Sequence, residues 1–410
     1  MLHSHSIWPA AGFALTATVV VFALSADAAD IFVNNQTGRA GNPGSKEQPL
    51  AQANRAVRMA QPGDTIHLLP DGTIYREALN LTNKSGLTIE GHGCTLSGAD
   101  PLPDDASQWE AAGPELFRRR VRANAESRYI LVQDGKGNRM GRNKFRREPL
   151  AEQFPAPDQL RPGEFRVEPI AGERSVWLYV KGSVRGLEWA VRQQGLMTGG
   201  HVRDITIRNL NARHALNDSF NLHADAQNVT LVNVQGYENY DNGISPHGAC
   251  SMTVENGKFW GNGTPAWAQG DATQTVYRRC EAKGSGHQWE VVFAGGVHRV
   301  EDSAIHLTGN ELWFVKWPIR AFALNEINLA GKDPTIKPEY SLLRTVVSGD
   351  PDKKGTVKIG AGVTLTLERC TFNNVKFDVD PAAVVRVAGS TADGQPLESL
   401  IKSAVIVRHE

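Results

Sequence analysis

The sequence predicts an all-β fold in which the chain winds as a parallel β-helix. Two segments nearly repeat, Asn-Asp-Ser-Phe-Asn-Leu-His at 217–223 and Asp-Asn-Gly-Ile-Ser-Pro-His at 241–247, and their closing histidines are 24 residues apart, from 223 to 247. An alternation of apolar residues follows each segment, at 229–233 and at 252–256. A period of this size is typical of a solenoid. If each repeat is one coil, equivalent residues on successive coils lie about 4.8 Å apart, the spacing of neighbouring strands.

The start of the chain predicts an export signal. Residues 9–24 form an apolar run that is followed by Ala26-x-Ala28, a small-residue cleavage pattern. We therefore interpret residues 1–28 as a signal peptide and expect a secreted or periplasmic protein. An uncleaved membrane anchor is the alternative, although the run is short for a bilayer span, and no later stretch is long and apolar enough to cross a membrane.

The segment after the signal predicts a cap and the first coils. Residues 30–33 form a short strand, and residues 49–60 carry apolar side chains at helical spacing. The Pro-Gly pair at 62–63 ends this helix. A helix here would cover the open end of the stack, where strand edges would otherwise be exposed. Strands near residues 66 and 89 are again 23 residues apart, so we expect residues 29–100 to form the N-terminal cap and the first coils.

Residues 101–187 interrupt the period and predict a small inserted antiparallel β region. They contain apolar runs at 129–132 and 176–180, the second bounded by Pro and Gly. The stacking resumes at Leu187, so residues 188–410 are expected to form the main parallel β-helix. Successive coils align through Ile205, Val229, Met252, Thr275 and His298.

The inserted region carries a marked charge asymmetry. Without residues 1–28 the chain has 44 Lys and Arg against 43 Asp and Glu, so net charge does not indicate a partner. Between Arg118 and Arg147, however, eleven Lys and Arg face only Glu126 and Asp134. A field of one sign attracts anions, although a solvated charged surface without a ligand is the alternative. For a secreted chain we expect an acidic polysaccharide as the partner rather than nucleic acid, and we expect a monomer.

Three asparagines close successive strands, at Asn209, Asn233 and Asn256. An inward Asn side chain at such a bend can bond to the backbone and to the equivalent Asn one coil away. We therefore assign these residues to structure rather than to chemistry. Tyr237 and Trp260 occupy equivalent loop positions and are expected to stack on each other.

Strand parity separates a candidate site from the core. Side chains of a strand alternate between two faces, and the apolar residues of both repeated segments are expected to face the interior. Asn221 and His223 then face outward, and Ser245 and His247 lie against them on the next coil. One coil beyond His247, the register reaches a position near Asp271. The sequence therefore predicts an exposed polar row that contains two stacked imidazoles.

Charged residues border this row. Asp218 and the pair Asp241-Asn242 precede the two strands, and Arg213 lies in the loop before the first of them. Two imidazoles about 5 Å apart disfavour each other's charged form, so at least one should be neutral near pH 7 and able to accept a proton. Asp271 or Asp241 could orient that imidazole or hold its partner charged. The alternative is that both histidines are solvated surface residues without a function.

At this point the chain resembles a known superfamily. The helix that ends in Pro-Gly-Asp-Thr at 62–65, the coils of 23 to 24 residues and the asparagine ladder resemble the right-handed parallel β-helix proteins of the pectate lyase-like superfamily, over nearly the whole mature chain. Segment 218–223, followed by Asp-Asn-Gly at 241–243, is similar to the family 9 pectate lyases. In that family the strand ends in a lysine base, so the resemblance implies a base role for His223. Their calcium-binding Asp cluster is not evident here, so the sequence requires no cofactor and leaves calcium open.

A second resemblance concerns the second repeated segment. Residues 242–247 are similar to the Tyr-Gly-x-Asp-Pro-His motif of mannuronan C5-epimerases, with Asn242 in place of the tyrosine and Ser245 in place of the aspartate. The Pro-His pair is retained. The ordered Asp motifs of polygalacturonase-type hydrolases are not found in the sequence.

These observations favour a polysaccharide lyase that cleaves a uronate-containing chain by β-elimination. This reaction needs a cation to neutralise the sugar carboxylate, a base for the adjacent proton and an acid for the leaving oxygen. We expect His223 or His247 as the base, and the second histidine or Tyr240 as the acid. Arg213 or Lys258 is expected to neutralise the substrate. Further substrate contacts are expected from Asn221, Asn242, Ser245 and Asp271.

Three alternatives stay open. A glycoside hydrolase would use Asp218 and Asp241, with carboxyl groups about 5 Å apart for retention or about 6.5 to 9.5 Å for inversion. A uronate epimerase would use the same fold. A non-catalytic glycan-binding protein would bind through the basic insertion, and its histidine row would be incidental.

Overall fold

The computed structural model describes residues 28–123, 128–133, 138–140, 155–284, 289–308, 311–315, 338–401 and 405–408. The expected signal segment up to residue 27, and much of the basic run between Arg118 and Arg147, lie outside the described residues. Within the described part of the chain, no helix is long and apolar enough to cross a membrane.

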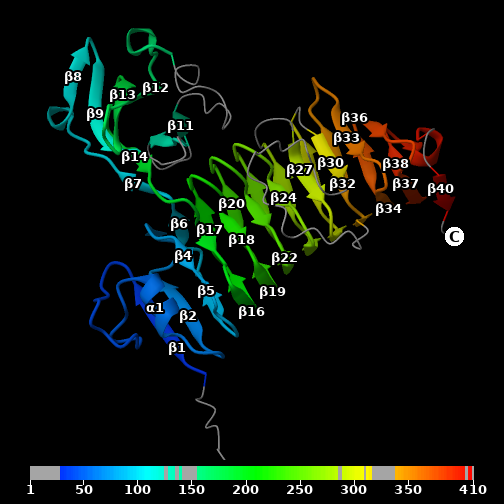
Figure 1. Cartoon of the computed structure of the whole chain (residues 1–410), viewed down its shortest axis with the longest axis horizontal. Coiled ribbons are helices and arrows are strands. Elements are labelled where there is room, and N and C mark those ends of the chain that lie inside the picture. Colours follow the sequence, from blue (N-terminus) through cyan, green and yellow to red (C-terminus); the bar gives the residue numbers. More distant parts are fainter. Residues whose placement is uncertain are drawn as a thin grey trace, which may run out of the picture.

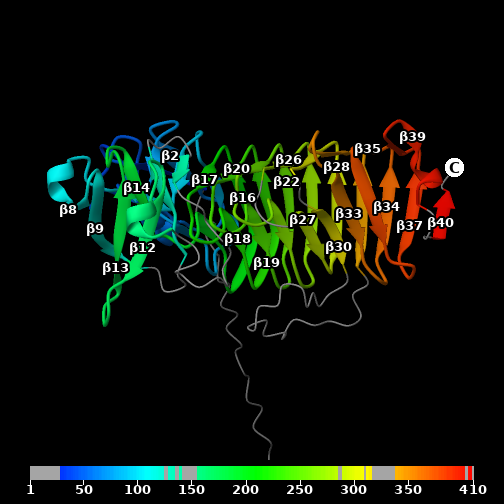
Figure 2. The ribbon, with the colours of Figure 1, turned by 90° about the horizontal axis from the view of Figure 1, so that it is seen from above.

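The chain winds as a β-helix with three parallel sheets along its length, which confirms the predicted fold class (Figures 1 and 2). In the described residues the first sheet has twelve strands: β1 (Asp30–Asn34), β2 (Thr65–Leu69), β5 (Thr88–Glu90), β16 (His201–Arg208), β19 (Asp225–Val232), β22 (Ser251–Glu255), β25 (Gln274–Arg278), β28 (Val297–Glu301), β31 (Glu339–Leu343), β34 (Thr364–Glu368), β37 (Val384–Ala388) and β40 (Val405–Arg408).

The other two sheets complete each coil. The described strands of the second sheet are β3 (Ile74–Tyr75), β6 (Thr95–Ser97), β17 (Asn211–Arg213), β20 (Gln235–Tyr237), β23 (Lys258–Trp260), β26 (Glu281–Lys283), β29 (Ala304–Leu307), β32 (Val346–Gly349), β35 (Thr371–Asn373), β38 (Thr391–Ala392) and β39 (Gln395–Pro396). Those of the third sheet are β4 (Leu79–Asn80), β15 (Leu196–Met197), β18 (Phe220–Leu222), β21 (Ile244–Pro246), β24 (Trp267–Gln269), β27 (Trp289–Ala294), β30 (Glu311–Val315), β33 (Gly355–Ile359) and β36 (Val375–Val379). A coil passes through the first, second and third sheets in turn.

The predicted register of the main coils is confirmed in the first sheet. Ile205 lies opposite Val229, Val229 opposite Met252, Met252 opposite Thr275, and Thr275 opposite His298. Inside, one apolar core runs along the helix and buries most side chains of this face. Because every coil buries its apolar side chains against the next coil, the stack is stabilised by burial between neighbours rather than by a single central core.

The N-terminal helix α1 (Ala53–Met59) packs against β1, β2 and β4 at the N-terminal end of the β-helix. Its inner face consists of Ala53, Ala56 and Val57, which are buried. The side chain of Glu77 accepts hydrogen bonds from the Ala53 and Asn54 backbone N–H groups at 2.9 and 3.1 Å. This carboxylate satisfies orphan donors at the start of the helix, where negative charge is favoured by the helix dipole.

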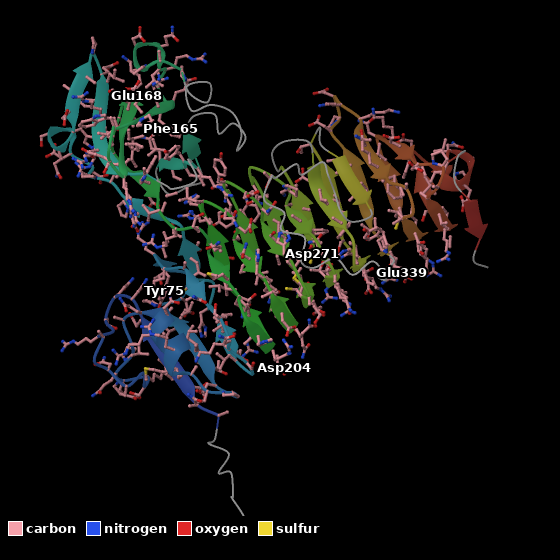
Figure 3. All side chains as sticks on the ribbon, in the orientation of Figure 1. Tyr75, Phe165, Glu168, Asp204, Asp271 and Glu339 are labelled. Carbon is pink, nitrogen blue, oxygen red and sulfur yellow. The ribbon has the colours of Figure 1, made fainter. Side chains whose placement is uncertain are left out.

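The inserted region is antiparallel, as predicted, and projects from the N-terminal part of the β-helix (Figure 1). One of its four-stranded sheets contains β7 (Ala99–Pro101), β10 (Leu131–Gln133), β11 (Asn138–Met140) and β14 (Leu187–Ala190). The other contains β8 (Glu110–Gly113), β9 (Leu116–Arg122), β12 (Phe165–Pro169) and β13 (Ser175–Lys181). Its own apolar cluster includes Phe165, Leu178 and Trp189. Figure 3 labels Phe165 and Glu168 in this region.

The asparagine ladder exists, but its predicted inward orientation is wrong. Asn233 Nδ2 donates to Asn209 Oδ1 at 3.1 Å, and Asn256 Nδ2 donates to Asn233 Oδ1 at 3.0 Å. Asn233 and Asn256 are exposed. All three residues have φ of +53°, so the backbone turns the corner between the first and second sheets in the left-handed region and directs the side chains outward. Asn tolerates this region better than most residues.

The aromatic pair at the second sheet is confirmed. The rings of Tyr237 and Trp260 stack at 4.3 Å with an interplanar angle of 4°. They occupy equivalent positions in β20 and β23.

We expect Asn233→Ala to lower the free energy of unfolding by about 1–2 kcal/mol, because alanine gains the left-handed penalty and loses the ladder hydrogen bonds. Asn233→Gly is the matched control, since glycine adopts positive φ without that penalty. Urea titrations of both variants would measure the difference. An alanine variant that is as stable as the glycine variant would contradict a backbone role for this corner.

Candidate functional site

The predicted pair of histidines lies at the edge of the third sheet. Phe220, Asn221 and Leu222 of β18 lie opposite the three residues of β21, so His223 and His247 follow at equivalent positions of adjacent coils. Their ring centroids are 5.0 Å apart and the rings are tilted by 48°. His223 is exposed and His247 is half-buried. The parallel register therefore holds two imidazoles side by side at the corner where the chain leaves the third sheet.

Hydrogen bonds fix this corner. The His223 backbone N–H donates to Thr198 Oγ1 at 2.9 Å. On the next coil, Ser245 Oγ and His247 Nε2 are 2.7 Å apart. Asp271 follows one coil later, and its Oδ2 accepts the Gly248 backbone N–H at 2.8 Å. Figure 3 labels Asp271 in the middle of the β-helix.

Both imidazoles are held in the neutral form. Loss of hydration, followed by the neighbouring His247, lowers the pKa of His223 to about 4. Burial lowers the pKa of His247, and this effect exceeds the opposing attraction of Asp271 and Asp241. At neutral pH each ring therefore has one nitrogen with a free lone pair, which is the form that accepts a proton.

Asn221 and Ser245 are not exposed as predicted. Asn221 is 4% exposed and Ser245 is 1% exposed. Parity still holds, because Phe220 and Leu222 belong to the apolar core and Asn221 does not. The exposed polar row predicted from parity is therefore reduced to the histidines, because Asn221 is drawn into a buried hydrogen-bond network.

Asp218 is the centre of that network. Its two carboxylate oxygens accept hydrogen bonds from Asn217 Nδ2 at 2.9 Å, Asn221 Nδ2 at 2.5 Å, Asn242 N at 3.0 Å and Asn242 Nδ2 at 2.9 Å. The side chain is 1% exposed, and burial together with the charge of Asp241 raises its pKa to about 7. Asp218 therefore ties two coils together and orients Asn221 and Asn242.

Arg128 is a residue of the insertion that reaches this network. It is 1% exposed, and its Nη1 donates to the Leu216 carbonyl oxygen at 3.0 Å and to Asn217 Oδ1. The same nitrogen lies 3.7 Å from Asp241 Oδ2, and the guanidinium lies over the Tyr240 ring at 5.8 Å. The sequence placed Arg128 within a basic run but gave no signal for this single contact.

Asp241 and Tyr240 belong to the same cluster. Thr264 Oγ1 lies 2.5 Å from Asp241 Oδ1 and 2.7 Å from Asn242 Oδ1. Tyr240 is 7% exposed. These groups line the contact between the insertion and the third sheet rather than the exposed corner with His223.

Arg213 and Lys258 lie on the second sheet. Arg213 ends β17, is 8% exposed and lies opposite Tyr237. Lys258 begins β23, is exposed and lies opposite Gln235 and Glu281. The structure therefore does not bring either cation together with the two histidines, which lie at the far edge of the third sheet. Among the described residues, no group of three or more His, Cys, Asp or Glu side chains is arranged to hold a metal ion.

Comparison with known proteins identifies the fold. No protein-family model matches the sequence, and no curated protein matches it. A solved structure of XylC with xylose is similar with a TM-score of 0.51 and 11% identity, covering 86% of this chain and 70% of that one. The fold is that of the pectate lyase-like parallel β-helix proteins.

Two further solved structures have lower TM-scores. A rhamnogalacturonan lyase has a TM-score of 0.49 and 10% identity, covering 92% of this chain and 84% of that one. Pectate lyase Pel9A has a TM-score of 0.46 and 12% identity, covering 94% and 79%. In this pectate lyase-like β-helix, the function has to be argued from its own residues, because a shared fold does not imply a shared reaction.

Proposed function

We propose that the protein is a secreted carbohydrate-active enzyme that cleaves a uronate-containing polysaccharide by β-elimination, with His223 as the base. The observation that carries this proposal is an exposed, neutral imidazole beside a second imidazole on the adjacent coil. A sugar ligand is in keeping with XylC, which has the same fold and whose structure contains xylose. The base would take the proton from the carbon next to the sugar carboxylate.

His247 is the better of the two candidate acids. It lies next to His223, whereas Tyr240 is buried beneath the guanidinium of Arg128. A neutral imidazole carries one N–H, which can be given to the leaving oxygen. Because Arg213 and Lys258 lie on the second sheet, the positive charge that neutralises the substrate carboxylate has to come from elsewhere. The assay is therefore run with and without calcium.

Hydrolysis by Asp218 and Asp241 is less well supported. Four protein N–H groups occupy the Asp218 carboxylate, and Thr264 and Arg128 lie against Asp241. A general acid or nucleophile needs an oxygen directed at the substrate. The hydrogen bonds instead support a structural role for this pair.

The test is incubation of the purified protein with a panel of acidic polysaccharides, namely polygalacturonate, alginate and a rhamnogalacturonan. Elimination is expected to produce an unsaturated uronate, detected by its ultraviolet absorbance, together with new reducing ends. Reducing ends without this absorbance would overturn the proposal in favour of hydrolysis. Retention on an immobilised polysaccharide without either product would overturn it in favour of a binding protein.

A further inference from the structure

Ser245 and His247 form an arrangement that elimination does not use. The two residues follow each other on one strand with one residue between them, and their Oγ and Nε2 atoms are 2.7 Å apart. We propose that Ser245, activated by His247, is a nucleophile that hydrolyses small acyl esters. That the acyl group is carried by a sugar hydroxyl rests on the proposed function; the ester chemistry itself does not.

The base has the geometry and the charge state for this role. A serine hydroxyl is a weak nucleophile until a base within about 2.6–3.2 Å accepts its proton, and the Ser245 to His247 distance lies in this range. Burial keeps His247 neutral, so its Nε2 can accept that proton. The charge of Asp271 favours the imidazolium that forms, and the Gly248 N–H holds the Asp271 carboxylate in place.

A donor for the substrate carbonyl lies on the preceding coil. Asn221 is opposite Ser245 in the register of β18 and β21. Its Nδ2 carries two hydrogens, and one of them is donated to Asp218 Oδ2 at 2.5 Å. The second hydrogen is the candidate donor to a carbonyl oxygen that becomes negative when Ser245 attacks. Such side-chain amides stabilise oxyanions when they are fixed beforehand, and Asp218 fixes this one.

The reaction balances without a further reactant except water. Ser245 Oγ forms a bond to the acyl carbon while its proton moves to His247 Nε2. The bond from the acyl carbon to the sugar oxygen then breaks, and the sugar oxygen takes the proton from His247. Water attacks the acyl-serine, loses its proton to His247, and releases the carboxylic acid while the proton returns to Ser245. Neither oxidation nor reduction occurs in this sequence.

A structural role for the same contact makes a different prediction. If Ser245 only orients the His247 ring, its hydroxyl is not reactive and forms no covalent adduct. The proposal predicts that a fluorophosphonate probe labels the folded protein once, on Ser245, as located by peptide mass spectrometry. It also predicts hydrolysis of 4-nitrophenyl acetate and release of acetate from an acetylated polysaccharide.

The experiment compares the wild type with three variants whose folding is checked by circular dichroism. Ser245→Ala is expected to lose the label and to lower ester hydrolysis on the order of a hundredfold or more. Ser251→Ala is the matched control, because Ser251 Oγ accepts the Asn228 N–H and is a serine of the neighbouring strand β22 outside this pair; it should keep the label. Should Ser245→Ala fail to fold, Ser245→Cys keeps a nucleophile in place and should react with iodoacetamide faster than the wild type.

An unlabelled wild type, a label on another residue, or unchanged ester hydrolysis in Ser245→Ala would each overturn the proposal. So would Ser245→Cys that reacts no faster than the wild type with its four buried cysteines. Because labelling and acetate release do not depend on an unsaturated uronate product, failure of this proposal and failure of the elimination reaction are read separately.

Discussion

His223→Ala is expected to lower kcat for polysaccharide cleavage by about 10²–10⁴-fold, because the variant has no group to take the substrate proton. The fold should be retained, since the side chain is exposed and its backbone N–H remains bonded to Thr198 Oγ1. Initial rates of formation of the unsaturated product would measure the loss. His201→Ala is the matched control, because His201 is 84% exposed on the first sheet, where it pairs with Asp225.

The pH profile gives a second readout for His223. Its lowered pKa of about 4 means that the base stays neutral down to acidic pH. In the wild type, kcat/KM should therefore fall as pH drops through about 4, the point at which His223 gains a proton and can no longer act as a base. Full activity in His223→Ala, or an acid limb that is unchanged in that variant, would contradict the assignment.

Arg128→Met is expected to lower the free energy of unfolding by about 3 kcal/mol or more, the usual range when one partner of a buried ionic contact is removed. The substitution removes the bonds to the Leu216 carbonyl oxygen and to Asn217, and it leaves Asp241 without its cation. Denaturant titration would measure the global effect. Hydrogen exchange of β10 should show faster local opening where the insertion meets the β-helix.

Arg120→Met is the control for this prediction. Arg120 lies on strand β9 of the same insertion and pairs with Glu173 at the surface, with 57% of its side chain exposed. An exposed ion pair contributes little, so the change should stay within about 1 kcal/mol. Equal effects of the two substitutions would show that Arg128 does not fasten the insertion to the third sheet.

The fold could be predicted because a solenoid repeats its register in the sequence. The 24-residue spacing of His223 and His247 is one coil, and parallel pairing then places the two rings together. Spacing along the chain therefore predicts neighbours along the axis of the β-helix.

The same spacing does not predict neighbours around a coil. Arg213 and Lys258 are close to the histidines in sequence, but each lies on the second sheet. Turn lengths decide which sheet a residue joins, and the repeat alone does not contain them. The contact between Arg128 and Asn217 spans 89 residues and depends on how the insertion docks, for which a local pattern has no signal. Burial of Asn221 and Ser245 was missed because parity tells which way a side chain points but not what covers it.

The left-handed corner between the first and second sheets has a consequence for how this protein can change in length. The ladder position is occupied by asparagine in three coils and then by Arg279, Asp302, Arg344 and Arg369, all with φ between +47° and +52°. Side chains of different size and charge thus fit one backbone geometry, since they project into solvent and meet only their ladder neighbours, as the ion pair between Arg344 and Asp302 illustrates. Insertion or removal of one whole coil would rejoin corners of identical shape, whereas loss of a single residue would shift every following side chain to the opposite face. The coil, rather than the residue, is therefore the unit in which the length of this chain can vary without loss of the fold.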